Sequence, residues 1–199
     1  MSSGELYRDY LAGDAALRPF FAHGVPDLAG AAQGLPAWSA PMLEGLSDYQ
    51  AELGLARGIS ADGLAVVTGQ QPGLLTGPLY TIYKAITAIH LAQRVANETG
   101  RAVTPIFWAA ADDHDFEEVR SACLLTRDHA LLELKYTPEA DIAGFPMHRV
   151  PVEASLHAIV DQAANEATGS EFTEEIRAFL HESLEASRSF SDWFCRILA

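Results

Sequence analysis

The segment of residues 64–84 constrains the fold of this chain more than any other part of it. It opens with a short apolar, β-branched run at residues 64–68, which predicts a buried strand. A loop follows, with glycines at Gly69, Gly73 and Gly77. Pro78 then marks a helix start, because its missing N–H is not needed at the first helical position. This order is typical of α/β proteins that present backbone N–H groups to a ligand, although the loop matches neither the P-loop nor the dinucleotide-binding pattern.

The predicted helix leads into a second strand, so this part of the chain is expected to form a βαβ unit. Helical spacing extends over residues 78–98 and places six residues on one face, which we expect to pack in the core. These residues are Leu79, Ile82, Tyr83, Ile86, Ile89 and His90. Residues 103–110 are apolar throughout, as central parallel strands are. The carboxyl ends of two such strands meet at one sheet edge, where open α/β sheets bind ligands.

The most polar cluster of the chain directly follows the second strand. It consists of Asp112, Asp113, His114 and Asp115, and we expect it to share a crevice with the glycine loop. A histidine there can act as a general acid or base, with one carboxylate holding its tautomer and another holding an amine. The alternative is a plain helix start, because Asp115 and Glu118 have the spacing of a capping box. That alternative leaves the three residues before Asp115 unexplained, so we predict a function for them.

A metal site is another alternative for the same cluster. Three carboxylates and a histidine could bind Mg²⁺ or Mn²⁺, which would suit a metal-assisted hydrolase. However, neighbouring residues cannot all point at one ion, and no second cluster supplies further ligands. We therefore predict no protein-bound metal.

Several residues near the glycine loop are further candidates. Gln70 and Gln71 offer donors and acceptors to a polar ligand, and Thr76 either caps the following helix or donates to a ligand. Tyr80 and Lys84 share a helical stripe, where the lysine could meet an anion or remain a surface lysine. His90 is interpreted as a core histidine. The remaining histidines are interpreted as ordinary surface positions: His23, His129, His148, His157 and His181.

The rest of the chain gives weaker signals. Residues 1–60 are predicted to form a helical N-terminal cover, and residues 61–199 an α/β core. Within the core, residues 130–136 suggest a third strand and residues 145–152 an extended segment. Helices are expected at 153–167 and 171–188. The apolar helical pattern at the end has no cap signal, so we expect the core to be incomplete and the chain truncated.

Composition narrows the class of protein. A net charge of −14 disfavours a nucleic-acid partner, since an acidic surface repels phosphate backbones. Cys123 and Cys195 are far apart and match no zinc or redox spacing. The sequence shows no signal peptide and no apolar run long enough for a membrane span. These features predict a cytoplasmic protein.

Two long motifs carry a resemblance to a known family. They are GQQPGLLTGPLYTIYKAITAIHLA, at residues 69–92, and PIFWAAADDHDFEEV, at residues 105–119. Together they resemble the cysteine-adding enzymes of bacillithiol biosynthesis, which are longer proteins with a coiled coil. The chain has Asp112 where that family usually has Glu, and Arg120 where it usually has Asn.

The resemblance implies a Rossmann-like parallel sheet, similar to the catalytic core of class I aminoacyl-tRNA synthetases and nucleotidylyl transferases. The two histidines of their first signature motif are absent between Gly77 and Tyr83, whereas Asp112–His114 looks like their second motif. The resemblance also implies a ligase that joins the carboxyl of L-cysteine to the amine of glucosaminyl malate. ATP, accompanied by Mg²⁺, is a possible cosubstrate, and the full-length protein is expected to be a homodimer.

The same resemblance assigns roles to the candidate residues. His114, Asp113, Asp115 and Lys84 are predicted to be catalytic: the histidine moves a proton, one of the aspartates holds the amine, and the lysine, with Tyr80, offsets negative charge. Substrate or nucleotide contacts are predicted for Gln70, Gln71, Gly73, Thr76, Gly77, Tyr80 and Asp112. A helical interaction module without catalysis remains the non-enzyme alternative.

Overall fold

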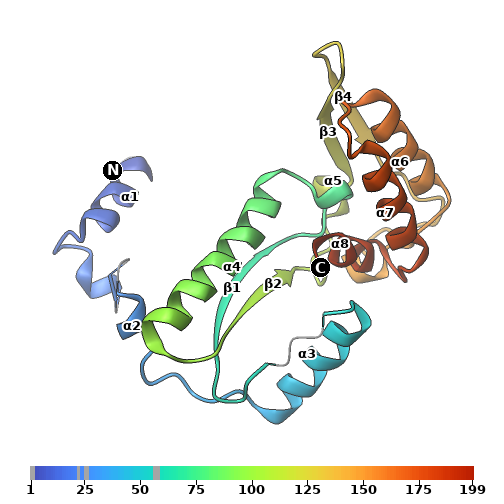
Figure 1. Cartoon of the computed structure of the whole chain (residues 1–199). Coiled ribbons are helices and arrows are strands. Elements are labelled where there is room, and N and C mark those ends of the chain that lie inside the picture. The colour runs from blue at the N-terminus through green and yellow to red at the C-terminus, as the bar shows by residue number, and fades with distance from the viewer. Residues whose placement is uncertain (1–2, 22, 25–26, 56–58) are drawn as a thin grey trace. The chain divides into compact units, whose positions relative to one another are not determined.

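The computed structural model describes the whole chain except residues 1–2, 22, 25–26 and 56–58 (Figure 1). The chain divides into two compact units, which are described separately. The first unit comprises Met1–Asp48, Arg57–Val66 and Ala88–Ile106, and the second comprises Tyr49–Ala56, Val67–Thr87 and Phe107–Ala199. No helix in the described part of the chain combines the length and apolar character needed to cross a bilayer.

The first unit contains the N-terminal helices. These are α1 (Ser3–Ala12), the 3₁₀ helix η1 (Arg18–Phe20), α2 (Leu28–Ala31) and most of α3 (Ala40–Glu52). Its small core is formed by Ala32, Leu64 and Val95. Arg101 links its segments by donating to the carbonyl oxygens of Ala32 and Asp62, at 3.0 and 2.7 Å.

The predicted βαβ unit is confirmed. It consists of β1 (Leu64–Gln70), α4 (Tyr80–Thr99) and β2 (Val103–Ala109), with β1 and β2 paired in a two-stranded sheet. The Leu64 N–H donates to Ala102 O at 2.8 Å, and the Ala110 N–H donates to Gln70 O at 3.0 Å. The first residues of the two strands therefore lie side by side, and so do their last residues. The strands are parallel, and their carboxyl ends meet at one edge of the sheet.

The close approach of the two strands requires a glycine. A Cβ at Gly69 would lie 2.6 Å from the Trp108 carbonyl oxygen, closer than side-chain carbons approach backbone atoms. Gly69 is therefore needed for strand packing as well as for the loop that follows.

The face of α4 predicted to be buried is exposed, so that prediction is wrong. Leu79 and Tyr83 are 61% and 60% exposed, and Ile82, Ile86, Ile89 and His90 are exposed as well. The buried positions of α4 are Thr81, Ala88, Ala92 and Val95. Small side chains on that face let the helix approach its neighbours closely, which hydrophobic spacing does not reveal.

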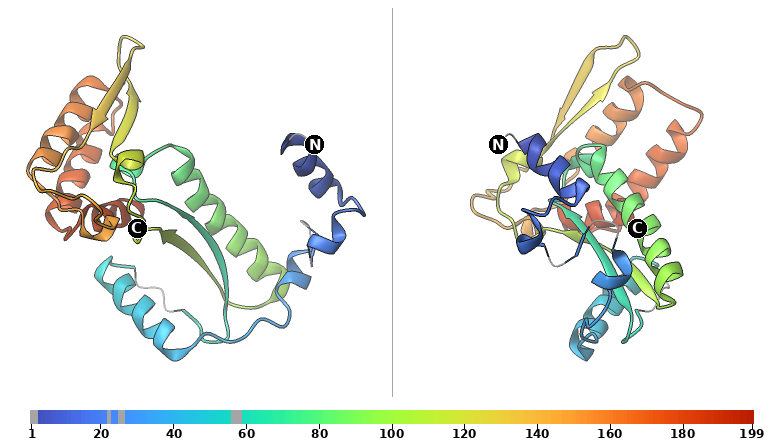
Figure 2. Two further views of the ribbon diagram at one scale, coloured as in Figure 1. Left: turned by 180° about the vertical axis from the view of Figure 1, so that it is seen from behind. Right: turned by 90° about the vertical axis from the view of Figure 1, so that its left-hand side faces the viewer.

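The predicted third strand exists, but it belongs to a different sheet. β4 (Leu131–Lys135) pairs antiparallel with β3 (Ser121–Leu125), which the sequence analysis missed, and Ser121 lies opposite Lys135. The turn between them is held by the Ala130 N–H, which donates to Thr126 Oγ1 at 3.1 Å. Figure 2 shows this hairpin standing beside the helices that follow it in the same unit.

Three helices complete the second unit: α6 (Ser155–Glu166), α7 (Thr173–Glu185) and α8 (Phe190–Leu198). The helices predicted at 153–167 and 171–188 are thus confirmed. The segment predicted as extended at 145–152 contains instead the 3₁₀ helix η3 (Met147–Arg149). The main core gathers Phe116, Tyr136, Phe190 and Trp193, all buried.

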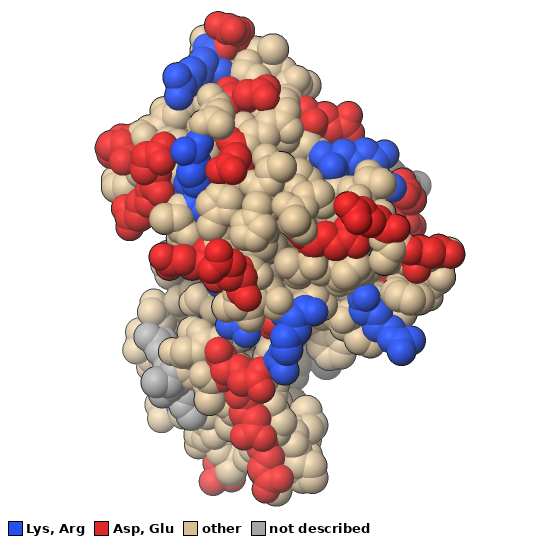
Figure 3. Space-filling view, turned by 90° about the vertical axis from the view of Figure 1, so that its right-hand side faces the viewer, with Lys and Arg blue, Asp and Glu red and all other residues tan. Residues whose placement is uncertain are grey.

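Charges are mixed on the face that carries α6 and α7. Figure 3 shows acidic side chains spread over this face with single Lys and Arg side chains between them. Among the described residues on that face, no continuous basic surface of the kind that binds nucleic acid is visible.

Candidate functional site at the ends of the parallel strands

The structure brings the glycine loop and the aspartate–histidine segment together. Gln71, just after β1, donates through Nε2 to Asp113 Oδ2 at 2.7 Å. The same nitrogen lies 3.1 Å from Glu118 Oε2, a residue that the sequence analysis assigned only to a helix cap. Both segments belong to the second unit, and the expected convergence at the strand ends is confirmed.

The glycine loop has a strained backbone. It contains the 3₁₀ helix η2 (Leu74–Thr76), in which Leu75 and Thr76 have φ values of 51° and 74°. Positive φ is uncommon for leucine and unusual for a β-branched threonine. A Cβ at Gly73 would lie 2.8 Å from the Gly77 Cα, so the loop closes only with glycine there. Such strain persists where the surrounding structure holds it and is common at functional sites.

The start of α4 offers an unused hydroxyl group. Thr81 is fully buried, and its Oγ1 has no hydrogen-bond partner among the residues described. Thr76 is also buried, but no bond from its side chain caps α4 within the described structure. Buried polar groups are nearly always paired, so the unpaired Thr81 hydroxyl is an exception in this part of the described structure.

Lys84 holds the end of β1. Its Nζ donates to Gly69 O at 3.1 Å and to Gln70 Oε1 at 3.0 Å, and it lies 5.0 Å from the centre of the exposed Tyr80 ring. An ammonium group has three N–H donors, and two of them are used in these contacts. Lys84 therefore positions Gln70 and keeps one donor available.

Asp113 is held on both of its oxygens. Oδ1 accepts from the Asp115 backbone N–H at 3.0 Å, and Oδ2 accepts from Gln71. These two bonds, that from Asp115 first, lower the pKa of the Asp113 carboxyl below its usual value. The expected capping box at Asp115 is wrong: its side chain makes no capping hydrogen bond to α5 (Phe116–Val119).

His114 and Asp112 lie at the site but are loosely held. The His114 side chain is 80% exposed, and its Nδ1 is 4.0 Å from Asp113 Oδ1, beyond hydrogen-bond distance. The predicted carboxylate that would hold its tautomer is therefore not in contact. Asp112 is exposed, and no three His, Cys, Asp or Glu side chains in the described ranges gather closely enough to hold a metal ion.

His148, interpreted from the sequence as an ordinary surface residue, is attached to this site. Its backbone N–H and its Nδ1 both lie at hydrogen-bond distance from the Ala111 carbonyl oxygen, at 2.9 and 3.0 Å. Next to it, the Met147 N–H donates to Asp113 O at 2.8 Å. No spacing in the sequence connects residue 148 with residue 111, so no sequence signal could have found this contact.

Arg120, where the chain departs from the family pattern, has a structural role. Its Nε donates to Tyr136 O at 2.8 Å, and its guanidinium also contacts Glu117 and Thr137. These bonds tie α5 to the end of β4.

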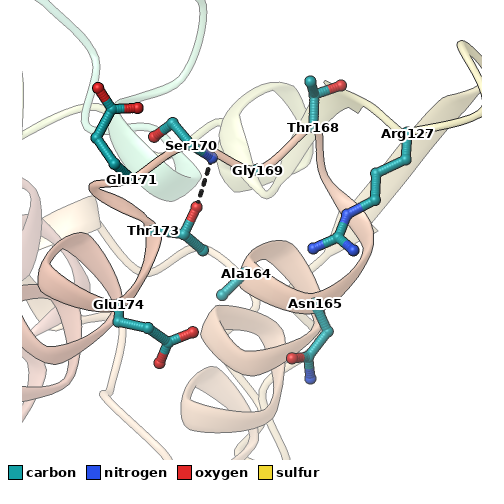
Figure 4. A pocket seen from close by; sticks show the side chains of 9 residues that line it. All are labelled: Arg127, Ala164, Asn165, Thr168, Gly169, Ser170, Glu171, Thr173 and Glu174. Carbon is teal, nitrogen blue, oxygen red and sulfur yellow. Dashed lines mark hydrogen bonds between the residues drawn. The ribbon is translucent and has the colours of Figure 1, made fainter.

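A cavity of about 680 Å³ opens elsewhere in the second unit, between the β3–β4 turn and the α6–α7 loop (Figure 4). The Ser170 N–H donates to Thr173 Oγ1 at 2.8 Å at its wall. Its lining residues are Arg127, Ala164, Asn165, Thr168, Gly169, Ser170, Glu171, Thr173 and Glu174. None of the predicted site residues lines this cavity.

The chain is similar to known proteins over most of its length. Residues 2–199 match the family model described as "Bacillithiol biosynthesis BshC, N-terminal Rossmann-like domain". The "Putative cysteine ligase BshC" of Salinibacter ruber is 36% identical over 137 residues, which cover 69% of this chain and 25% of the relative. The protein of the same name from Natranaerobius thermophilus is 37% identical over 135 residues, covering 68% and 24%.

A third relative of that name, from Heliobacterium modesticaldum, is 40% identical over 141 residues, covering 59% of this chain and 26% of its own. The chain thus spans about a quarter of the length of the curated relatives it matches. The resemblance based on the two motifs and the predicted α/β, Rossmann-like fold class are both confirmed. The chain belongs to the BshC family of bacillithiol biosynthesis and corresponds to the N-terminal Rossmann-like domain of that family.

Proposed function

We propose that this domain contributes the reaction site of a cysteine ligase, which joins the carboxyl of L-cysteine to the amine of glucosaminyl malate. The observation that carries the proposal is the 2.7 Å hydrogen bond between Gln71 and Asp113, which unites the two family motifs at one sheet edge. The names of the curated relatives support the cysteine ligase class. The alternative classes, a metal-assisted hydrolase and an interaction module, have no such support.

Amide formation needs two polar substrates held side by side. Correct placement of reactants can supply on the order of 7–11 kcal/mol of the barrier, more than a single acid or base contributes. Asp113 is a fixed anion whose oxygens face donors, which suits it to holding the incoming amine. Asp115 and Asp112 add negative charge beside it, and a histidine at this edge would carry the proton, the role that the sequence analysis gave to His114.

The loop side of the site would receive the carboxyl substrate and the nucleotide. The remaining N–H of Lys84, with Tyr80 beside it, would offset the charge of a carboxylate or phosphate. The loop of Gln70, Gly73, Thr76 and Gly77 would contact the nucleotide, because a glycine-rich turn at a helix start can present backbone N–H groups to an anionic ligand. ATP, with Mg²⁺, would supply the free energy that makes the cysteine carboxyl reactive.

An assay of product formation tests the proposal directly. The full-length protein is incubated with L-cysteine, glucosaminyl malate and ATP, and the amide is measured by mass spectrometry. We expect product only when all three are present, with release of a nucleotide product. Absence of the amide under these conditions, with folded protein, would rule the proposed function out.

We also propose that the protein works in the cytoplasm as a homodimer. Both cysteines are free thiols, which suits a reducing compartment. Light scattering of the full-length protein at micromolar concentration checks the dimer, and a monomeric mass would exclude it.

A further inference from the structure

Backbone hydrogen bonds of η3 place His148 near the carboxyl ends of β1 and β2. Its backbone N–H donates to Ala111 O, the residue that precedes Asp112, and the Met147 N–H donates to Asp113 O. Two backbone bonds therefore hold η3 against the aspartate–histidine segment. The imidazole contacts the same carbonyl group, with Nδ1 3.0 Å from the Ala111 oxygen.

The partner of this ring determines its tautomer. A carbonyl oxygen only accepts hydrogen bonds, so Nδ1 must carry a proton to bond with it. In the neutral imidazole the lone pair is then on Nε2. This nitrogen has no partner among the residues that the structure describes, and the side chain is exposed. The result is a ring fixed at one nitrogen and ready to accept a proton at the other.

His114 has no comparable arrangement. Nothing within hydrogen-bond distance orients its ring in the described structure, and its closest charged neighbour, Asp113 Oδ1, is 4.0 Å away. A general base works best when its geometry is held before the reaction, so the held ring is the better candidate.

We propose that His148 Nε2 accepts the proton of the reacting amine; this inference rests on the proposed function and specifies its base. As the amine nitrogen bonds to the activated carboxyl carbon of cysteine, the bond from that carbon to its leaving group breaks, and its electron pair departs with the leaving group. The amine proton moves to Nε2, and the imidazolium keeps its Nδ1–H on Ala111 O. Asp113, whose backbone oxygen accepts from the Met147 N–H next to His148, holds the amine.

Two substitutions separate proton transfer from loop positioning. In H148N the amide nitrogen can replace the Nδ1–H donor to Ala111 O, but the side chain has no basic nitrogen. In H148A both functions are lost. A matched control is H129N in the β3–β4 turn, where His129 has a φ of 61° that asparagine tolerates well.

We expect H148N to melt near the wild-type temperature and to lose about 10²–10⁴-fold in kcat. H129N should keep the wild-type rate. Activity of H148N within threefold of wild type would show that His148 only positions the loop and would overturn the inference.

Failure of the proposed function is distinguishable from this result. If the wild-type protein makes no amide, the ligase proposal fails, and the inference fails with it. If the wild type is active and H148N is equally active, only the inference fails. Nitrogen-15 NMR of the wild-type protein adds a readout without substrate: a neutral His148 protonated at Nε2 rather than Nδ1 would also overturn the inference.

Discussion

His148, at the strand ends, forms a hydrogen bond through one ring nitrogen. His181, between α6 and α7, forms hydrogen bonds through both of its ring nitrogens. His181 Nδ1 lies 2.7 Å from His157 Nδ1, and its Nε2 lies 3.0 Å from Asp161 Oδ1. The two rings are stacked with centres 5.0 Å apart. The comparison shows that residue type alone does not tell a catalytic histidine from a structural one. A histidine with both nitrogens bonded is suited to joining helices, and one with a free nitrogen is suited to proton transfer.

The aspartates of the second unit show the same contrast. Asp192 is buried in α8 and accepts from the Tyr49 hydroxyl at 3.2 Å and from the Arg188 N–H at 2.9 Å. Asp113 is also doubly bonded, but its side chain remains about one-third exposed at a loop. Asp192 is therefore a packing element, whereas Asp113 can still meet a substrate.

The largest expected effect is on catalysis at Asp113. We expect D113A to lower the rate of amide formation by at least about 10²-fold, because a misplacement of reactants by about 1 Å is already enough for such a loss. The melting temperature should fall slightly, because the bonds from Gln71 and Asp115 are lost. D161A, which removes the carboxylate of the histidine pair, is the matched control and should keep the rate. Loss of activity in D161A equal to that in D113A would abolish the distinction between the two regions.

The second effect concerns stability at the histidine pair. H181A removes a hydrogen-bond partner of both His157 and Asp161, and we expect it to lower the free energy of unfolding by about 1 kcal/mol, because Asp161 is half exposed and still faces Arg177. Urea denaturation of the full-length protein measures this loss, while the rate of amide formation stays near wild type at low denaturant. An H181A protein as stable as the wild type would show that the pair does not stabilise the packing of α6 on α7.

A smaller effect is expected in acid. Because the pKa of Asp113 is lower in the folded protein than its ordinary value of about 3.9, its bonds stabilise the fold above that value. This stabilisation disappears as the pH falls from about 4 through the lowered pKa. The stability difference between wild type and D113N should therefore be constant near neutral pH and shrink below about pH 4. Urea midpoints measured against pH test this, and parallel curves at all pH values would contradict it.

The smallest effect concerns the two thiols, where surroundings again decide behaviour. Burial raises the pKa of the Cys195 thiol, whereas Cys123 on β3 is exposed. We expect iodoacetamide at pH 8 to modify Cys123 first, because the thiolate is the reactive form. Peptide mapping by mass spectrometry measures both rates. In C123S only the slow reaction should remain, and equal rates at both cysteines would refute the assignment.

Part of the candidate site was predictable because its signals are local. The apolar run before Gly69, the proline at residue 78 and the second apolar strand specify a βαβ unit without knowledge of distant contacts. Parallel strands then bring Gln71 and Asp113 to one edge by geometry alone. The exposed face of α4 was mispredicted because hydrophobic spacing reports which residues share a face, not whether small residues on the opposite face allow closer packing.

The sequence by itself determined the order of strand, glycine loop, helix and strand, and with it the place where the two family motifs meet. The tertiary structure decided that β4 pairs with β3 and that His148 contacts Ala111. The physical reason is separation along the chain. Local patterns set backbone conformation, whereas contacts between residues many positions apart depend on the folded geometry.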